Sequence, residues 1–301
     1  MRTTAAVLWA CVVASGACAY DDLDVTDDEG GYEGLDDDIG SSEHEALVLN
    51  NGPLVPGNLP KLDLSVMNSI PFTDGVKVLG CSSTGVTCYK LHPNLTSLYN
   101  TYGNPLFDAI VMCGMRQSII VKMPSGRLVQ GSEMGKWATR SGLNPWWTAP
   151  PDLTTRQRVS ACLAAKHNAS FSGVSINLTH PGDLSKSKMY PEMTVAANLF
   201  KPSGRYVRMW AGSNQLGSRC DFWSPYASRR SCSNPNDTAN CSYITQDYAN
   251  DTTCDRSGVA WTNCVAQNGV HYYDTVSVYL DGGRDCEGPS KCDGEDCIGK
   301  K

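Results

Sequence analysis

Apolar residues recur at helical spacing in two stretches of the chain. In residues 104–113 an asparagine and a proline precede a run of apolar residues that ends at a glycine, an order typical of a short buried helix. In residues 154–168 the side chains on one face recur at spacings of three and four: Val159, Cys162, Leu163 and Lys166. We therefore predict a helix in each stretch, with the stem of the lysine lying along the apolar face of the second.

Other stretches have the alternation or the β-branched content of strands. Residues 118–123 and 127–130 are separated by Pro-Ser-Gly, which predicts a hairpin. We expect three further strands, over 173–178, 205–210 and 275–280. Helices and strands are mixed without a repeating βαβ order, so we expect a single α+β domain with a mainly antiparallel sheet. Residues 212–268 have little periodicity and predict a loop-rich second half.

Residues 1–19 have the features of a signal peptide. Arg2 precedes an apolar stretch over residues 3–15, and small residues around Cys18 form a cleavage site. Cys18 also follows small residues as in a bacterial lipobox, in which that cysteine carries lipid. Free secretion and a lipid anchor on Cys18 both stay open. No apolar run has the length of about 20 residues that a membrane span needs, so we expect no transmembrane segment.

Charge and composition divide the remainder into four parts. Residues 20–60 hold 12 carboxylates and no Lys or Arg, and we expect this acidic leader to be disordered. Residues 46–75 are rich in Pro and Gly, and we expect residues 61–75 to be a linker into a domain over 76–280. An acidic, cysteine-containing tail follows over 281–301.

The domain is basic although the whole chain has a net charge of −6. Residues 61–280 hold 20 basic and 13 acidic residues. This excess has two explanations, an ordinary solvated face or a surface that binds an anionic polymer such as cell-surface polysaccharide. Arg229 and Arg230 form the one adjacent basic pair of this body, and no bases interleave with aromatics. Nucleic acid is therefore not an expected partner.

Twelve cysteines remain after the signal region, and none of them has C-x-x-C spacing. That absence argues against a zinc site or a redox dithiol, and we expect up to six disulfides in an oxidising compartment. Cys81 and Cys88 flank a turn-rich segment that could close a small loop. If all twelve pair, the three tail cysteines require at least one bridge to the body. The twelve are Cys81, Cys88, Cys113, Cys162, Cys220, Cys232, Cys241, Cys254, Cys264, Cys286, Cys292 and Cys297.

Four parts of the chain have familiar sequences: 142–146, 159–165 with Asn168, 173–176, and Glu192 with 198–200. They resemble a family of uncharacterised secreted bacterial proteins and lipoproteins, often myxobacterial. The resemblance covers about residues 104–280. It implies a signal or lipobox, a low-complexity leader and a cysteine-rich second half, and it implies no activity. The chain departs from the family at Arg158, where Trp is common, and at 195–197, where aromatics and Gly are usual.

No motif in the chain names a reaction. The nucleophile elbow G-x-S-x-G is absent. Cys162 and His167 are five residues apart on the predicted helix, about 140° around its axis, so they point apart and do not form a thiol–base pair. Four side chains could supply scattered acid–base groups: His167, His180, His271 and Glu192. We expect no cofactor and no metal.

Two functions remain open. We favour a non-enzymatic secreted or cell-envelope protein that binds a surface polymer or an envelope partner. A possible ligand face consists of Trp146 and Trp147, held between prolines, together with Arg229 and Arg230. The alternative is an extracellular hydrolase whose catalytic residues are scattered in sequence.

Overall fold

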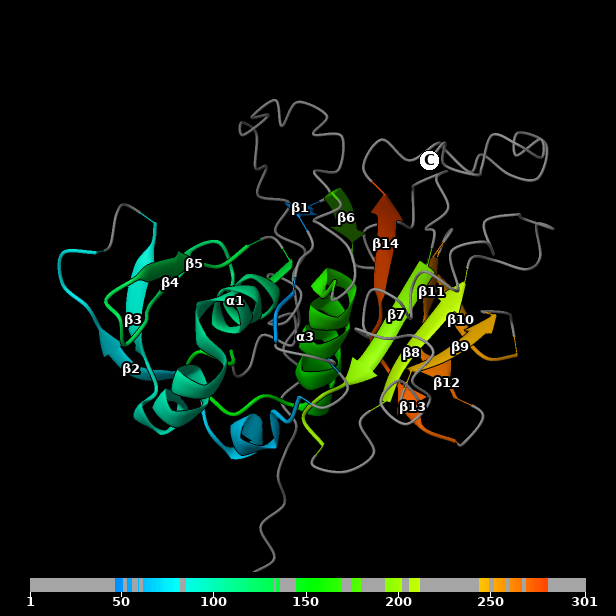
Figure 1. Cartoon of the computed structure of the whole chain (residues 1–301), viewed down its shortest axis with the longest axis horizontal. Helices are drawn as coiled ribbons and strands as arrows, with labels where there is room; N and C mark the ends of the chain where they lie inside the picture. Colours follow the sequence, from blue (N-terminus) through cyan, green and yellow to red (C-terminus); the bar gives the residue numbers. More distant parts are fainter. Residues whose placement is uncertain are drawn as a thin grey trace, which may run out of the picture. The chain divides into compact units, whose positions relative to one another are not determined.

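The chain forms an α+β fold with mainly antiparallel sheets, seen in a computed structural model (Figure 1). All described residues lie in one unit, Glu43–Lys301. The structure describes residues 47–50, 53–55, 59, 62–81, 85–132, 134–135, 145–168, 175–179, 193–201, 206–211, 244–248, 252–257, 260–266 and 269–280.

A six-stranded sheet carries the second half of the described chain. Its order is β1-β6-β14-β7-β8-β9, and all neighbours are antiparallel except β8 and β9. The first and last thirds of the chain therefore meet in one sheet, because β1 and β14 both pair with β6. The strands are β1 (Leu47–Asn50), β6 (Ser175–Thr179), β7 (Met193–Asn198), β8 (Tyr206–Ala211), β9 (Ile244–Tyr248) and β14 (Val276–Leu280).

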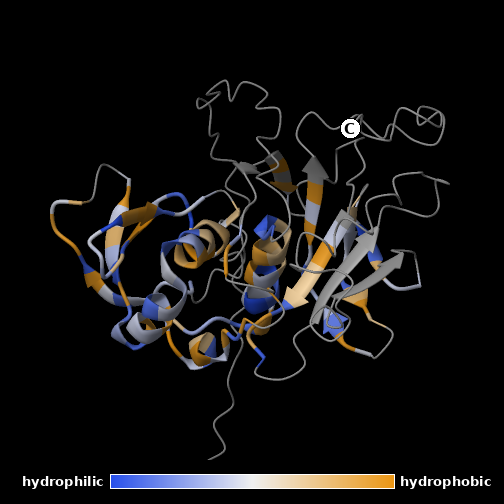
Figure 2. Cartoon of the chain, viewed as in Figure 1, coloured by the Kyte–Doolittle hydropathy of each residue, from blue (hydrophilic) through white to orange (hydrophobic). Residues whose placement is uncertain are grey.

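Helix α3 (Leu153–Lys166) packs on one face of this sheet, against β7 and β14. Strand residues of that face, such as Val195 and Val278, belong to the main hydrophobic core together with α3. The helix is buried from Gln157 to Ala165, with its polar face included, because α1 covers the side that the sheet leaves open. Figure 2 shows hydrophobic residues along α1, α3 and β7.

The first half forms a four-stranded sheet in the order β2-β3-β4-β5. Strands β3 and β4 are parallel, and α1 (Thr96–Gly114) connects them. Gly103 adopts φ 74°, which kinks α1 directly before the Asn-Pro start of the predicted helix. The strands are β2 (Thr73–Lys77), β3 (Thr87–Leu91), β4 (Ile119–Lys122) and β5 (Leu128–Gln130), and 3-10 helices cover Ser65–Ser69 and Pro93–Leu95.

Two short hairpins form a second, smaller core on the other face of β7. Ala196 points away from α3 and joins a cluster of buried residues from these hairpins: Cys254, Trp261, Cys264, Ala266 and Tyr272. Strand β7 is thus covered on both faces of the sheet. The hairpins pair β10 (Asp255–Ser257) with β11 (Ala260–Thr262), and β12 (Cys264–Val265) with β13 (His271–Tyr272).

Three disulfides join cysteines of the described part. Cys81–Cys88 closes the small loop that the sequence predicts. Cys113–Cys162 joins α1 to α3 inside the main core, and Cys254–Cys264 joins the two hairpins. The prediction of disulfide bonding is confirmed for these six cysteines. The other six, Cys220, Cys232, Cys241, Cys286, Cys292 and Cys297, lie outside the described residues.

The predicted helices and the hairpin are present, and so are the strands predicted near 173–178, 205–210 and 275–280. Described structure begins before residue 76, where the sequence predicts that the domain starts. The segment expected to be leader and linker contributes β1 to the large sheet and buried side chains to the main core. These side chains include Leu54, Leu59, Leu62, Leu64 and Met67. Proline and glycine interrupt regular structure there, but the apolar residues between them still gain by burial.

Candidate functional site

Trp146 does not belong to a ligand surface, which corrects the sequence prediction. Its side chain is 1% exposed, and its ring lies 5.0 Å from Phe72 and 5.7 Å from Phe200, edge-on to both. Gly114 makes room for the indole, because a Cβ there would lie 2.7 Å from the Trp146 ring. Burial of a large aromatic ring against other rings is lower in free energy than its exposure to water, so the proline-flanked segment places Trp146 in the core.

Trp147 is half-buried, and the guanidinium of Arg116 lies 5.7 Å from its ring. Its backbone carbonyl accepts a hydrogen bond from Thr73 Oγ1 (2.5 Å). The residue therefore ties the segment after 145 to β2, and its ring is already partly covered. Arg229 and Arg230 lie outside the described residues.

The predicted acid–base residues are not brought together in the described part. His167 is fully buried, and its Nδ1 accepts a hydrogen bond from the amide of Leu54 (3.0 Å), which gives it a structural role. His180 and Glu192 lie outside the described residues. Cys162 is bonded to Cys113, as its predicted structural role requires.

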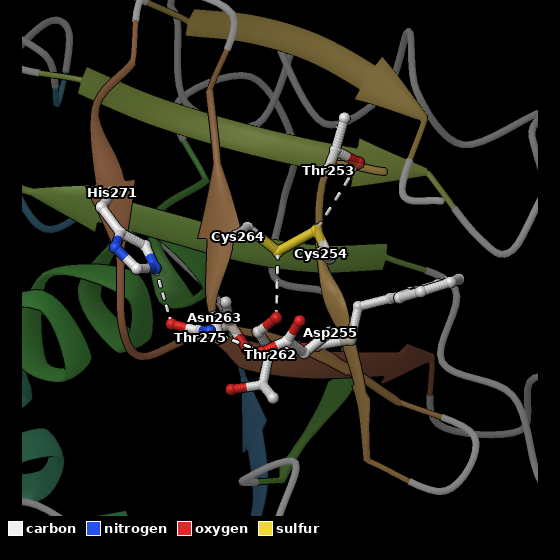
Figure 3. Close-up of a disulfide and its surroundings, with 9 residues drawn as sticks. Thr253, Cys254, Asp255, Thr262, Asn263, Cys264, His271 and Thr275 are labelled. Carbon is white, nitrogen blue, oxygen red and sulfur yellow. Dashed lines mark hydrogen bonds between the residues drawn. A yellow bond between two sulfur atoms is a disulfide. The ribbon is translucent and has the colours of Figure 1, made fainter. Parts of the chain in front are cut away.

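His271 is the remaining candidate, and it belongs to a hydrogen-bonded surface cluster. Its Nε2 donates to Asn263 Oδ1 (2.6 Å), and Asn263 Nδ2 donates to Asp255 Oδ2 (2.5 Å). The three side chains follow one another beside the Cys254–Cys264 disulfide (Figure 3). The ring of Tyr273 lies 4.0 Å from the imidazole and continues the row.

Two residues of α3 hold the backbone beneath this cluster. The buried amide of Gln157 donates to the carbonyl of His271 (2.8 Å) and accepts from the amide of Tyr273 (2.8 Å). The next residue, Arg158, forms a buried ion pair with Asp274. The segment 271–274 is thus fixed from inside the molecule, while the side chains of His271 and Tyr273 reach the surface.

The outer face of the four-stranded sheet carries a second candidate surface. Alternate strand residues point inward, and Tyr89, Val121 and Val129 are buried. The opposite positions of β3, β4 and β5, apart from the buried, disulfide-bonded Cys88, form what we call the lysine face. It consists of Lys90, Lys122, Ile120, Leu128 and Gln130. Lys90, Leu128 and Gln130 are exposed, and the other two are half-buried.

Lys90 and Lys122 are direct neighbours on the parallel strands β3 and β4. Among the described residues, neither ammonium group has an ion-pair partner. Asp74 of β2 accepts a hydrogen bond from the amide of Val76 in its own strand (2.9 Å). The sequence analysis missed both lysines, although each stands at an outward position of its strand, in TCYKL and IIVK. Register alone brings them side by side.

Opposite charges meet where α1, α3 and β5 approach one another. Arg127 Nη2 lies 2.6 Å from Asp108 Oδ2, while Asp108 Oδ1 is buried without a hydrogen-bond partner. Burial raises the pKa of Asp108 above its usual value of 3.8, although Arg127 and Lys166 oppose the shift. Burial likewise lowers the pKa of Lys166, whose Nζ lies 3.9 Å from Met112 Sδ. Each of these charges already faces an opposite charge within the fold, so this cluster is not a candidate surface for a charged ligand.

Within the described ranges, no three or more His, Cys, Asp or Glu side chains gather as a metal site would require. None of the helices described is both long and apolar enough to cross a membrane. The chain matches no protein-family model, no curated protein and no solved structure.

Proposed function

We propose that this is a non-enzymatic, secreted or envelope-associated protein that binds an anionic polymer, and that the lysine face is the binding surface. The observation that carries the proposal is the neighbouring pair Lys90 and Lys122 on an open sheet face. Anionic cell-surface polysaccharide is the polymer class that best fits an exported protein. The alternative partner is an envelope protein with an acidic surface, which has the same negative charge as the polysaccharide.

The electrostatics of the pair favour an anion. Adjacent strands lie about 4.8 Å apart, and two unit charges at such a separation repel by about 1 kcal/mol in water. Like charges placed opposite each other therefore destabilise a sheet. A carboxylate or sulfate bound between the two ammonium groups removes that repulsion and gains two attractions.

The remaining side chains of the lysine face suit an extended polymer. Leu128 is 47% exposed in the same row as the two lysines. Ile120 and Gln130 form the neighbouring row, so charged, apolar and amide groups lie together on one open sheet. Such a face can contact both the anionic groups and the backbone of a polymer chain.

Export is supported by the signal-like start and by the cysteines. Three disulfides in the described part are compatible with an oxidising, extracellular location. The resemblance to secreted bacterial proteins and lipoproteins points the same way. A lipid on Cys18 remains part of the proposal as the alternative to free release.

The test is binding of polygalacturonate, an anionic polysaccharide, with neutral dextran as the control polymer. The Lys90→Gln/Lys122→Gln variant is expected to bind about tenfold more weakly, a loss of about 1.4 kcal/mol. Its melting temperature should not fall, because the change removes a repulsion. Affinity of the unaltered protein should decrease between about 50 and about 200 mM salt.

Lys201→Gln is the matched control, because Lys201 is an exposed lysine after β7, outside the lysine face. It should leave binding of polygalacturonate unchanged. The single variant Lys90→Gln removes the same charge from the lysine face. Equal losses of affinity in Lys201→Gln and Lys90→Gln would show attraction by net charge alone and would overturn the assignment to the lysine face. Release of reducing ends from the polymer would contradict the non-enzymatic role and favour the hydrolase.

A further inference from the structure

We propose that Tyr273, His271, Asn263 and Asp255 form a binding subsite for a neutral pyranose sugar. We call these four residues the Tyr273 cluster. The proposal does not depend on the lysine face, because it rests on different residues, on a different sheet, and on a ligand without charge.

The Tyr273 cluster presents an aromatic ring next to planar polar groups. The Tyr273 side chain is 49% exposed and stacks at 38° on the imidazole of His271. From the imidazole, hydrogen bonds of 2.6 Å and 2.5 Å lead to Asn263 and then to Asp255. Figure 3 shows His271, Asn263 and Asp255 one after another beside the Cys254–Cys264 disulfide.

The side chains of the cluster are held in place from below. Asp255 and Asn263 are each adjacent in sequence to one half of the Cys254–Cys264 disulfide. The buried amide of Gln157 bonds the backbone on both sides of residue 272. Binding loses less conformational entropy when the side chains that contact the ligand are already ordered. This support therefore favours affinity for a ligand.

Asn263 has φ 51°, and it is the one non-glycine residue with positive φ in the described chain. Asparagine tolerates this conformation better than most residues, but the conformation is still sparsely populated. Such backbone strain concentrates at ligand sites. Here the unusual backbone directs the amide between His271 and Asp255.

Hydrogen-bonding capacity remains for a ligand. Within the described part, Asp255 Oδ1, His271 Nδ1 and the Tyr273 hydroxyl form no hydrogen bond. Carboxylate and amide groups pair with neighbouring sugar hydroxyls, and an aromatic face packs on the apolar C–H face of a pyranose. The exposed carboxylate of Asp255 repels uronic acids, so we infer a neutral sugar.

The experiment is calorimetric titration of the full chain with hexasaccharides of glucose, mannose, galactose and N-acetylglucosamine. We expect at least one to bind, with an affinity that does not change between about 50 and about 200 mM salt, since no charge is paired. Tyr273→Ala and Asp255→Asn should each weaken binding about tenfold or more. Tyr273→Phe, which keeps the ring, should retain most of the affinity.

Val265→Ala is the matched control, because Val265 is exposed and pairs with His271 across the hairpin but lies outside the cluster. It should leave binding unchanged. Lys90→Gln/Lys122→Gln should also leave it unchanged, which separates this proposal from the lysine face. Binding of none of the four hexasaccharides, or binding that survives Tyr273→Ala while that variant keeps its Cys254–Cys264 disulfide, would overturn the proposal.

Discussion

Arg158 and Asp274 form an ion pair whose side chains are 6% and 4% exposed. The pair joins α3 to the segment that leads into β14. Arg158→Met leaves the carboxylate buried without its cation, so we expect a loss of about 3 to 5 kcal/mol in the free energy of unfolding, measured by urea denaturation.

Arg156→Met is the control for that substitution, because Arg156 is two residues away on the same helix and only half-buried. Its Nη1 donates to Asn68 Oδ1 (3.0 Å) and forms no buried ion pair. We expect a loss of less than about 1 kcal/mol. Similar losses for the two variants would contradict a special role of the buried pair.

Asp108 should make stability fall as pH rises. Because burial raises its pKa above 3.8, the folded chain holds this proton to higher pH than the unfolded chain does. Its contribution to stability is present in full below pH 3.8 and is lost as the pH rises through the folded-state pKa. Carboxyl-carbon NMR titration should show a pKa above that of an unfolded peptide.

Arg127→Gln and Lys166→Met test the causes of this shift. Both cations lower the pKa of Asp108, and Arg127 has the larger effect. Each substitution should therefore raise the pKa of Asp108 further, Arg127→Gln more than Lys166→Met. The pH at which the fall in melting temperature ends should move upward in the same order, because the folded-state pKa of Asp108 sets that end. A downward shift in either variant would be incompatible with these contacts.

At the scale of elements, the disulfides should differ in how much each contributes to the free energy of unfolding. Cys113–Cys162 spans 49 residues and connects two helices, whereas Cys81–Cys88 spans 7 and closes a surface loop. Loop-closure entropy assigns them about 4 and about 2 kcal/mol. Paired Cys→Ala variants compared by urea denaturation should preserve this order.

At the scale of the whole molecule, the remaining cysteines restrict one another. The early four cysteines pair among themselves, and so do Cys254 and Cys264. Three cysteines of residues 220–241 and three of the tail remain, all outside the described residues. If every cysteine pairs, the odd number in each group requires at least one bridge between the groups.

Peptide mapping without reduction tests this prediction. It should find a peptide from residues 220–241 linked to one from 281–301, and intact mass should rise by two hydrogens per bridge on reduction, for six bridges. Tail cysteines recovered as free thiols would contradict it. In that case no disulfide would tether the tail to the domain.

Local pattern explains what could be predicted from the sequence of this chain. The helix at 104–113, the hairpin at 118–130 and the loop disulfide depend on residues close together, so caps, turns and periodicity reveal them. The α+β class follows from the order of those elements. Strand β7 was missed because its residues are buried on both faces, which removes the alternation that marks a strand.

Tertiary structure decided everything that depends on partners far apart in the chain. Burial of Trp146 depends on Phe200, and inclusion of β1 and of apolar residues such as Leu54 and Leu64 depends on β6 and the main core. Both candidate surfaces arise in the same way, through strand register at Lys90 and Lys122 and through the hairpins at Tyr273. The physical reason is that the conformational preference of a short segment depends on its own residues and can be inferred from the sequence. Which side chains are exposed to water depends instead on pairing between segments far apart in the chain.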